Sequence, residues 1–577
     1  MSMNMMAQQH PLDIPEVLFQ VALYLDAKGV LACSLVSRTF HSALAPFIWR
    51  NLHVGLDPSQ HTTIRHQDPL ARFIPINTQV SNNQGQSQPS EDGLLQVLQR
   101  AAPWMRSLFI HEHYSARQLE FAEHCTMLKS LLIKGPPKND KFDTTYWNSC
   151  KALVRQNSAH LRSLTMILWN KSYEGQKVPT WTPISCGEYR NLRSLSVKGG
   201  SINREQRALY WRVFENLESL TLESTYVAPS PSDTDDTTSQ SSPPVFPKLR
   251  KLALNCLIGT DLVSQLEWLI CVCPMLQILE WTLRQTTRFP VQFKHRFVGL
   301  TWPELDSITI KGHLDDVTHD DYKSILEAAP RPFKVLDLKI EYLTPDLITL
   351  LRQSHFETLT KMDLSLAVGA LNPRCYVMGI PCLVQEVLQS CPLLEHITAK
   401  TITANVIING EPWVCLGLKE FKVMIDMEFW KTEPELQSRC HPAFAQLGRL
   451  EQLRVLDLRR HNLFPRKRAY YPLPLELRLG LGQLSRLENI EVIGFHGSQD
   501  IRMTDLEWML RSWPYLVTIY GGQLSRKRSR TFKGVYVRNL LLVSMLNSRG
   551  VRFLRHENDQ EMRVSLDVSA LYDTDSE

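Results

Sequence analysis

The sequence predicts a mixed α/β chain in which three short helices precede a long, curved solenoid of strand–helix units. Two observations predict this fold class. Apolar residues recur at helical spacing over residues 11–52, and a Leu-x-x-Leu-x-Leu pattern keeps returning after residue 100. A chain of 577 residues is too long for one ordinary hydrophobic core, and stacked units solve this problem because each buries the apolar face of its neighbour.

Residues 11–52 form the helical segment. Pro15 suits a first helical turn, where its missing N–H costs nothing, and Gly29 marks a break before the second helix. Two apolar stripes each lie on one helical face: Ile14, Leu18, Val21 and Leu25 in the first helix, and Val36, Phe40 and Leu44 in the third. A segment this small buries its apolar faces poorly. It is therefore either a module that docks on a partner or a cap on its own chain, and periodicity leaves both open.

The order of motifs in this segment favours a module that docks on a partner over a cap on its own chain. An Ile-Pro-Glu start leads into a helix ending in Tyr24-Leu25, and the stretch from Leu31 to Phe40 and a closing Pro46-x-x-Trp49 follow. This order resembles the F-box, with Ile in place of the first Leu and Phe40 where Trp is common. The resemblance implies that the segment binds the small Skp-type adaptor of a cullin ubiquitin ligase, since helical stripes dock into grooves of partner proteins. The adaptor-binding positions that it implies are Ile14, Pro15, Leu18, Val21, Leu25, Leu31, Leu35 and Val36.

Fifteen copies of the leucine pattern follow, with successive starts 23 to 35 residues apart. The alternating last three positions of each copy predict a short strand with one buried face. Helical stretches lie between copies, and four of them stop at a proline, namely Pro274, Pro330, Pro392 and Pro514. The copies begin at Met105, Leu128, Leu161, Leu192, Leu217, Leu249, Leu276, Leu305, Phe333, Leu359, Leu394, Leu418, Leu453, Leu487 and Leu516.

A strand and a helix at this period are the signature of leucine-rich repeats, and the copies resemble the long, irregular kind that often follows an F-box. The Asn or Cys of that family after the strand is mostly absent, and only QLRVLDLRRHNL comes near it. A helical HEAT-type solenoid is the structural rival, but it lacks the recurring alternation. A polar linker sets the helical segment apart from the repeats. The domains expected are an F-box at 8–55, a linker or insertion at 56–92, a solenoid at 93–572 with a disordered loop at 228–246, and an acidic tail at 573–577.

The position after the last leucine of a copy is often basic. Strand geometry places this position on the open face of the solenoid. Neighbouring strands lie about 4.8 Å apart, so basic residues at this position in successive copies would form a continuous row of positive charge. Asp337 and Asp457 stand two residues before Lys339 and Arg459, so we expect those pairs to neutralise each other. Four cations have no acid at that spacing. We expect them to bind an acidic or phosphorylated protein substrate, the alternative being a solvated face: Lys134, Lys198, Lys311 and Lys400.

Composition argues against several other classes of protein. The formal net charge of +5 is small for this length and gives no reason to expect nucleic acid as a partner. No apolar run approaches the roughly 20 residues of a membrane span, so we expect no membrane partner. The twelve cysteines lack zinc-site spacing and fit a reducing compartment, which predicts a cytoplasmic or nuclear protein. The basic run at 526–530 is a nuclear-import signal, a phosphate-contacting loop or solvated surface.

The sequence also lacks a catalytic signature. It has no Gly-rich phosphate loop, no nucleophile elbow and no zinc-protease motif, and His111 and His113 have no third metal ligand nearby. We therefore expect no cofactor, no metal and no catalysis. The predicted function is that of the substrate-recognition subunit of a Skp–cullin–F-box ubiquitin ligase. A ligase-independent repeat scaffold is the alternative, and a solenoid with an embedded enzyme is the third class considered.

Overall fold

The computed structural model describes the helices and strands of two compact units, and each unit is described by itself. Unit 1 comprises residues 1–287 and 301–304, and unit 2 comprises residues 288–300 and 305–577. The residues described are 15–22, 27–49, 51–54, 72–74, 96, 98–110, 117–135, 144–168, 188–202, 204–227, 245–255, 273–282, 302–311, 323, 325–327, 329, 331–338, 345–364, 379–430, 432–459, 471–495, 501–521 and 545–554.

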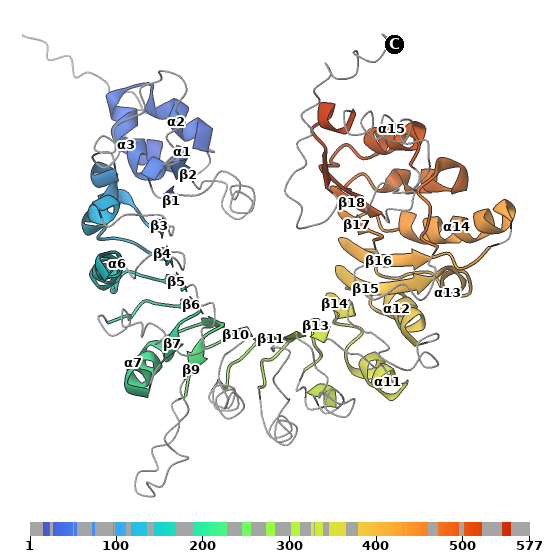
Figure 1. Cartoon of the computed structure of the whole chain (residues 1–577), viewed down its shortest axis with the longest axis horizontal. Helices are drawn as coiled ribbons and strands as arrows, with labels where there is room; N and C mark the ends of the chain where they lie inside the picture. Colours follow the sequence, from blue (N-terminus) through green and yellow to red (C-terminus); the bar gives the residue numbers. More distant parts are fainter. Residues whose placement is uncertain are drawn as a thin grey trace, which may run out of the picture. The chain divides into compact units, whose positions relative to one another are not determined.

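Unit 1 begins with three helices, α1 (Pro15–Ala22), α2 (Ala27–Ser34) and α3 (Arg38–Trp49) (Figure 1). The Ser37 hydroxyl accepts a hydrogen bond from the Phe40 backbone N–H at 3.1 Å and so caps the start of α3. Helix α3 packs against both α1 and α2. The small core between them holds Ala22, Val30 and Leu44, with Cys33 and Phe40 packed against it.

The rest of unit 1 is built on a parallel sheet whose strands run in the order β2-β1-β3-β4-β5-β6-β8-β10-β11 (Figure 1). Strands β7 (Ser201–Ile202) and β9 (Tyr226–Val227) form a separate parallel pair. The described helices between strands are η3 (Ala102–Trp104), η4 (Arg117–His124), α6 (Thr144–Asn157) and α7 (Arg204–Phe214). The main sheet consists of β1 (Asn51–Val54), β2 (Arg72–Ile74), β3 (Ser107–Ile110), β4 (Ser130–Lys134), β5 (Ser163–Ile167), β6 (Ser194–Lys198), β8 (Ser219–Glu223), β10 (Lys251–Asn255) and β11 (Ile278–Thr282).

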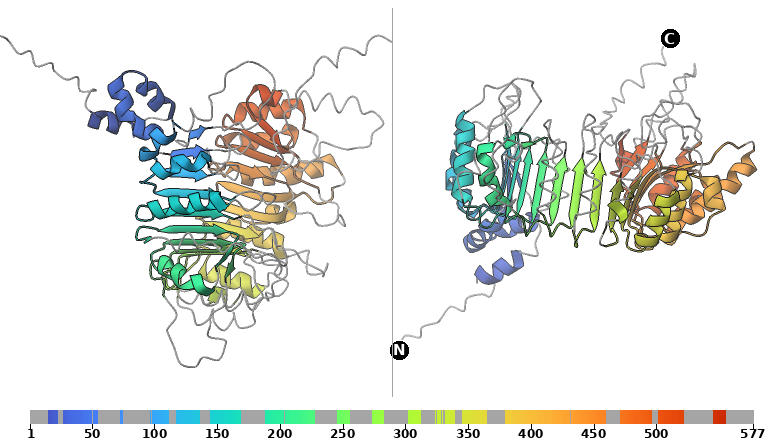
Figure 2. Two further views of the ribbon diagram at one scale, coloured as in Figure 1. Left: turned by 60° about the vertical axis from the view of Figure 1, so that its left-hand side comes forward. Right: turned by 90° about the horizontal axis from the view of Figure 1, so that it is seen from below.

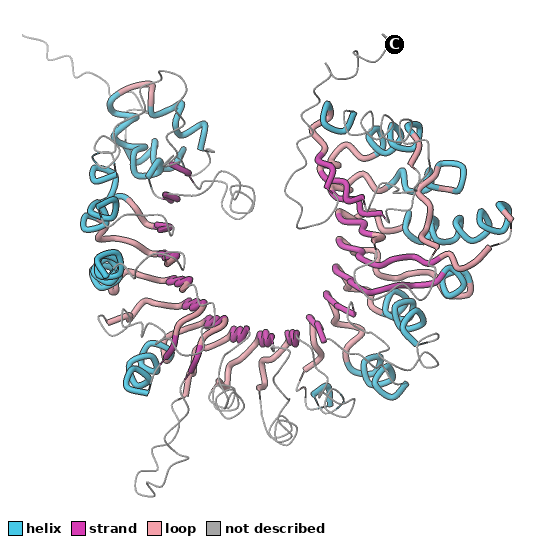
Figure 3. Tube along the Cα trace, viewed as in Figure 1, coloured by secondary structure: helices cyan, strands magenta, loops and turns pink. Residues whose placement is uncertain are grey.

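Unit 2 repeats this architecture with strands that pair in parallel in chain order from β12 to β20. Its strands are β12 (Ser307–Lys311), β13 (Val335–Leu338), β14 (Lys361–Leu364), β15 (His396–Thr403), β16 (Glu420–Asp426), β17 (Val455–Asp457), β18 (Val492–Phe495), β19 (Thr518–Gly521) and β20 (Arg552–Leu554). Its described helices are α11 (Pro345–Ser354), α12 (Gly379–Ser390), α13 (Ala404–Ile408), α14 (Glu433–Gly448), η7 (Leu477–Leu479), η8 (Leu481–Arg486) and α15 (Met503–Ser512). Within each unit the helices between strands lie on one side of the strand ladder, whereas α1–α3 of unit 1 lie at its β1 end (Figures 2 and 3).

Each of the fifteen leucine copies carries a strand of these sheets. The apolar positions of the pattern point inward and are buried, as Leu131 and Ile133 of β4 are on either side of the partly exposed Leu132. In some copies the intervening residue is buried as well, as Phe109 in β3 and Asp457 in β17 are. One predicted register is wrong. The buried triplet of β18 is Ile490, Ile493 and Phe495, so that copy starts at Ile490, three residues after the predicted start at Leu487.

Two of the predicted helical stretches, those that stop at Pro392 and Pro514, are confirmed by α12 and α15. Residues 260–272 of the stretch that stops at Pro274 lie outside the described residues. The helical segment is not set apart from the repeats as the linker had suggested. Strand β1 follows α3 almost directly and pairs with β3, and β2 lies within the expected linker at 56–92. Phe246, at the end of the expected loop 228–246, is buried and packs against Phe214, with ring centroids 5.7 Å apart. Across the described residues, no helix combines the length and apolar character that a membrane crossing needs.

Candidate functional site

The three N-terminal helices leave several large apolar side chains uncovered. Leu35 is 79 % exposed and Val36 is 69 % exposed, and both lie in the turn between α2 and α3. Two backbone hydrogen bonds shape this turn, from Leu35 N–H to the Ala32 carbonyl at 3.2 Å and from Val36 N–H to the Cys33 carbonyl at 3.1 Å. On α1, Val17 and Val21 are also exposed and lie one helical turn apart. Exposed apolar side chains concentrated on one small module are typical of a docking surface.

These positions can be compared with the predicted adaptor-binding set. Val21, Leu35 and Val36 are exposed, whereas Leu18 is buried and therefore not accessible to a partner in the free chain. Pro15 begins α1 and Leu31 lies in α2, but their side chains, like Ile14 and Leu25, fall outside the described residues. The sequence reasoning missed Val17, although its spacing to Val21 places both on one face of α1.

Fold and exposure together define a mixed α/β chain in which an exposed helical module leads into parallel strand ladders. A comparison with known families identifies the module. Residues 15–54 match the model of the F-box-like family, so the chain carries an F-box-like domain there. The matched residues cover the three helices and β1. No curated protein matches the chain.

The predicted column of free lysines is not what the structure shows. Lys198 Nζ lies 2.5 Å from Glu223 Oε1, because Glu223 stands directly opposite Lys198 in the neighbouring strand. Lys400 is buried, with 3 % of its surface exposed, since β15 continues past it to Thr403. Lys134 ends β4 and is partly exposed, and Lys311 ends β12 with its side chain outside the described residues. These lysines therefore do not form one exposed stripe.

The expected pairing of Asp457 with Arg459 is present and is buried rather than exposed. Arg459 Nε and Nη2 donate to the two carboxylate oxygens of Asp457 at 2.9 and 2.6 Å. The guanidinium also stacks over the Tyr520 ring at 4.3 Å, two strands away. The strand between them supplies Gly494, whose lack of a side chain leaves room for the pair. Asp337 is also buried, and Lys339 lies outside the described residues.

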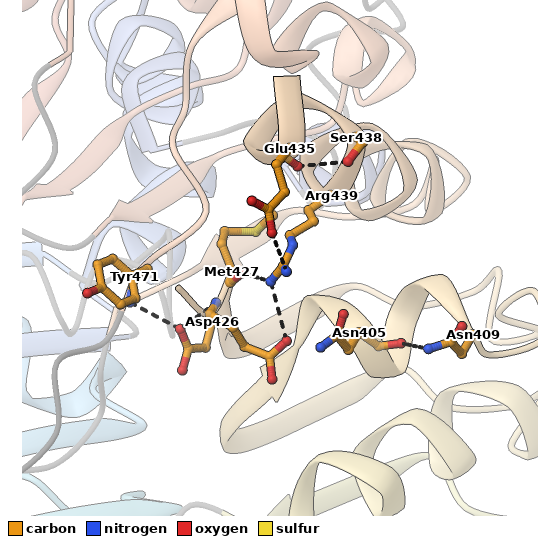
Figure 4. A network of polar contacts seen from close by, with 9 residues as sticks. Asn405, Asn409, Asp426, Met427, Glu435, Ser438, Arg439 and Tyr471 are labelled. Carbon is orange, nitrogen blue, oxygen red and sulfur yellow. Dashed lines mark hydrogen bonds and ion pairs between the residues drawn. The ribbon is translucent and has the colours of Figure 1, made fainter. Parts of the chain in front are cut away.

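A second polar network fixes the loop that follows β16 (Figure 4). Asp426 Oδ1 accepts hydrogen bonds from the backbone N–H groups of Glu428 and Tyr471, at 3.0 and 3.1 Å. Arg439 in α14 donates to the Met427 carbonyl at 2.9 Å and to Glu435 at 2.8 Å. These contacts hold Glu428 at a positive φ of 58°. The network is internally satisfied at Asp426 and Arg439, and its role is to shape the loop.

The structure also reveals a charged column that the sequence reasoning missed. The second residue of each copy precedes the strand, and in unit 1 it is basic in five of six successive copies: Arg106, Lys129, Arg162, Arg193, Glu218 and Arg250. We call this column the rim of unit 1. The recurring tetrapeptides LKSL, LRSL and LESL are its signal in the sequence.

Metal-ligating side chains and cysteines are the remaining reactive groups of the described residues. No group of three or more metal-ligating side chains occurs among them, and His111 and His113 lie outside them. Burial raises the pKa of the thiols of Cys125, Cys150 and Cys415 to about 12, so these cysteines are protonated and act as small apolar side chains.

Proposed function

We propose that the chain is the substrate-recognition subunit of a Skp–cullin–F-box ubiquitin ligase. The observation that carries the proposal is the exposure of Leu35 and Val36 on the F-box-like domain. F-box domains generally bind Skp-type adaptors, and an apolar surface of this kind is what an adaptor groove would cover. The adaptor in turn would connect the chain to a cullin.

The strand ladders behind the domain supply the other half of the proposal. Stacked copies of a strand–helix unit, with one buried and one open strand face in β4, β5 and β8, suit a leucine-rich-repeat solenoid that holds the target protein. The chain itself would perform no chemistry. It would act by raising the local concentration of target lysines beside the ubiquitin carrier, in the cytoplasm or the nucleus. A ligase-independent scaffold, in which the same helices only cap the repeats, is the competing function.

The test is capture of a purified Skp-type adaptor by the full chain and by the double variant Leu35→Asp/Val36→Asp. Burying one Leu or Val contributes about 1.5–3 kcal/mol, so losing both and introducing two carboxylates should weaken capture by more than about a hundredfold. The thermal unfolding of the variant should stay within a few degrees of the wild type, because both side chains are already exposed in the free chain.

The matched control is Leu393→Asp/Val517→Asp, which replaces the same residue types at positions in unit 2 that are 57 % and 46 % exposed. This control should bind the adaptor as the wild type does. Equal binding by the Leu35/Val36 variant would contradict the assigned surface. A wild-type chain that captures no adaptor would leave only the scaffold function.

A further inference from the structure

The column that forms the rim is basic in unit 1 and balanced in charge in unit 2. In unit 1 five cations stand in the column with one carboxylate, Glu218. In unit 2 the same column holds three acids and three bases that pair along the ladder: Lys334 with Asp306 at 2.9 Å, Lys419 with Glu395 at 2.7 Å, and Arg454 with Glu491 at 3.7 Å. The repeat therefore neutralises this column in one unit and leaves it basic in the other.

The backbone stacks the residues of the unit 1 rim directly on one another. The N–H of Lys129 donates to the Arg106 carbonyl at 2.7 Å, that of Arg162 to Lys129 at 2.7 Å, and that of Arg193 to Arg162 at 2.9 Å. The ladder continues through Glu218 to Arg250. At about 4.8 Å per strand the rim spans about 24 Å, which equals about seven residues of an extended peptide.

Several of these cations are available to a ligand. Lys129, Arg162 and Arg250 are exposed, and within the described part of the chain none of them has an acidic partner. Arg193 does pair with Glu218 at 2.8 Å, but both side chains are about half exposed, and such surface pairs exchange readily for a stronger anion. Arg106 is partly buried and donates to the carbonyls of Pro103 and Met105.

Hydroxyl groups line the rim on its strand side. The residue after each cation is a serine in four copies and after Glu218 in a fifth, and these serines stand opposite one another in register: Ser107, Ser130, Ser163, Ser194 and Ser219. All five are partly exposed. A serine hydroxyl donates hydrogen bonds to carboxylate or phosphate oxygens, so the two columns together offer charge and donors to a row of anions.

We propose that the unit 1 rim binds an extended acidic or phosphorylated peptide segment of about seven residues, a length set by the strand spacing. The inference rests on the proposed function in that this segment would belong to the substrate. A protein ligand is favoured over single-stranded nucleic acid because the described rim and serine columns contain no aromatic side chain on which a base would stack.

The test measures fluorescence anisotropy of three labelled probes at 150 mM salt: a heptaglutamate peptide, a seven-residue peptide of alternating glycine and phosphoserine, and a seven-nucleotide oligouridylate. The full chain should bind at least one of the two peptides. The variant Lys129→Glu/Arg162→Glu/Arg250→Glu should bind that peptide at least tenfold more weakly. The peptide that binds with the lower Kd shows whether the rim prefers carboxylates or phosphates.

The matched control is Lys334→Glu/Lys419→Glu/Arg454→Glu, which changes the net charge by the same amount in the same column of unit 2. It should change peptide binding less than threefold. The proposal is overturned if neither peptide binds, if the two triple variants weaken binding equally, or if the oligouridylate binds more tightly than both peptides. Adaptor capture, measured on the same preparations, reports separately on the proposed function and should be unchanged in both triple variants.

Discussion

Replacing Gly494 by alanine tests how unit 2 accommodates its buried ion pair. A Cβ atom at this position would lie 2.7 Å from Asp457 Cγ, closer still to Asp457 Oδ1, and 3.0 Å from Arg459 Nε. Real Cβ contacts are longer, so the carboxylate and the guanidinium must move. Asp457 is almost completely buried, and it therefore has no solvent into which it can turn.

The loss of folding free energy in Gly494→Ala follows from the contacts that Asp457 and Arg459 would lose on moving. Asp457 accepts two hydrogen bonds from the Arg459 guanidinium and one from the Arg459 backbone N–H at 3.0 Å. Breaking a buried ion pair typically costs 3–5 kcal/mol, and partial retention of these bonds brings the expected loss to about 3 kcal/mol. For a unit of this size that loss corresponds to a fall in melting temperature of about 6–12 °C.

Gly417 provides the matched control in the same unit, because a Cβ atom there would meet no other atom within 4 Å. Gly417→Ala should be neutral or stabilising by up to about 1 kcal/mol. Calorimetry gives the melting temperature, and hydrogen exchange of β17 locates the weakened strand. If Gly494→Ala melts at the same temperature as Gly417→Ala and protects β17 equally well, the reasoning about the packed pair is refuted.

Three further predictions concern buried polar groups. Burial lowers the pKa of His355 to about 4, so between pH 6.5 and 4 the unfolded chain binds a proton that the folded chain does not. The free energy of unfolding, measured by denaturant titration, should therefore fall by about 2 kcal/mol from pH 7 to pH 5. The variant His355→Gln should remove this pH dependence. Asn157 accepts from Leu128 N–H at 2.8 Å and donates to the Leu153 carbonyl at 2.9 Å, so Asn157→Ala should cost about 2–4 kcal/mol by calorimetry, and a loss under 0.5 kcal/mol would contradict its role. Asp426→Ala leaves two backbone N–H groups without their acceptor and should speed hydrogen exchange at Glu428 and Tyr471, whereas unchanged exchange would show that the loop does not depend on this carboxylate.

The strands were predictable because their signal is local and strong. Each leucine triplet fixes which residues face inward, and a parallel ladder needs nothing more. The offset at Leu487 has a simple origin: Leu487, Ile490 and Val492 satisfy the pattern as well as Ile490, Ile493 and Phe495 do. Strand β1 was missed because Asn51–Val54 is short and acquires its strand conformation through pairing with β3.

The binding surfaces were harder to predict because they depend on which face packs inward. Periodicity placed Leu18 and Val21 on one stripe, but it does not contain the information that Leu18 is buried and Val21 is exposed in the folded module. The pairing of Lys198 with Glu223 likewise requires the register between the strands of two successive copies. Spacing within one copy does not contain that information.

The central claim is that the F-box-like domain binds a Skp-type adaptor, and isothermal titration calorimetry of the full chain with the purified adaptor tests it most directly. We expect saturable binding of one adaptor per chain with a negative heat-capacity change, because the adaptor would remove the apolar surface at Leu35 and Val36 from contact with water. Absence of binding heat at several temperatures, with the adaptor at tens of micromolar or more, would contradict the claim.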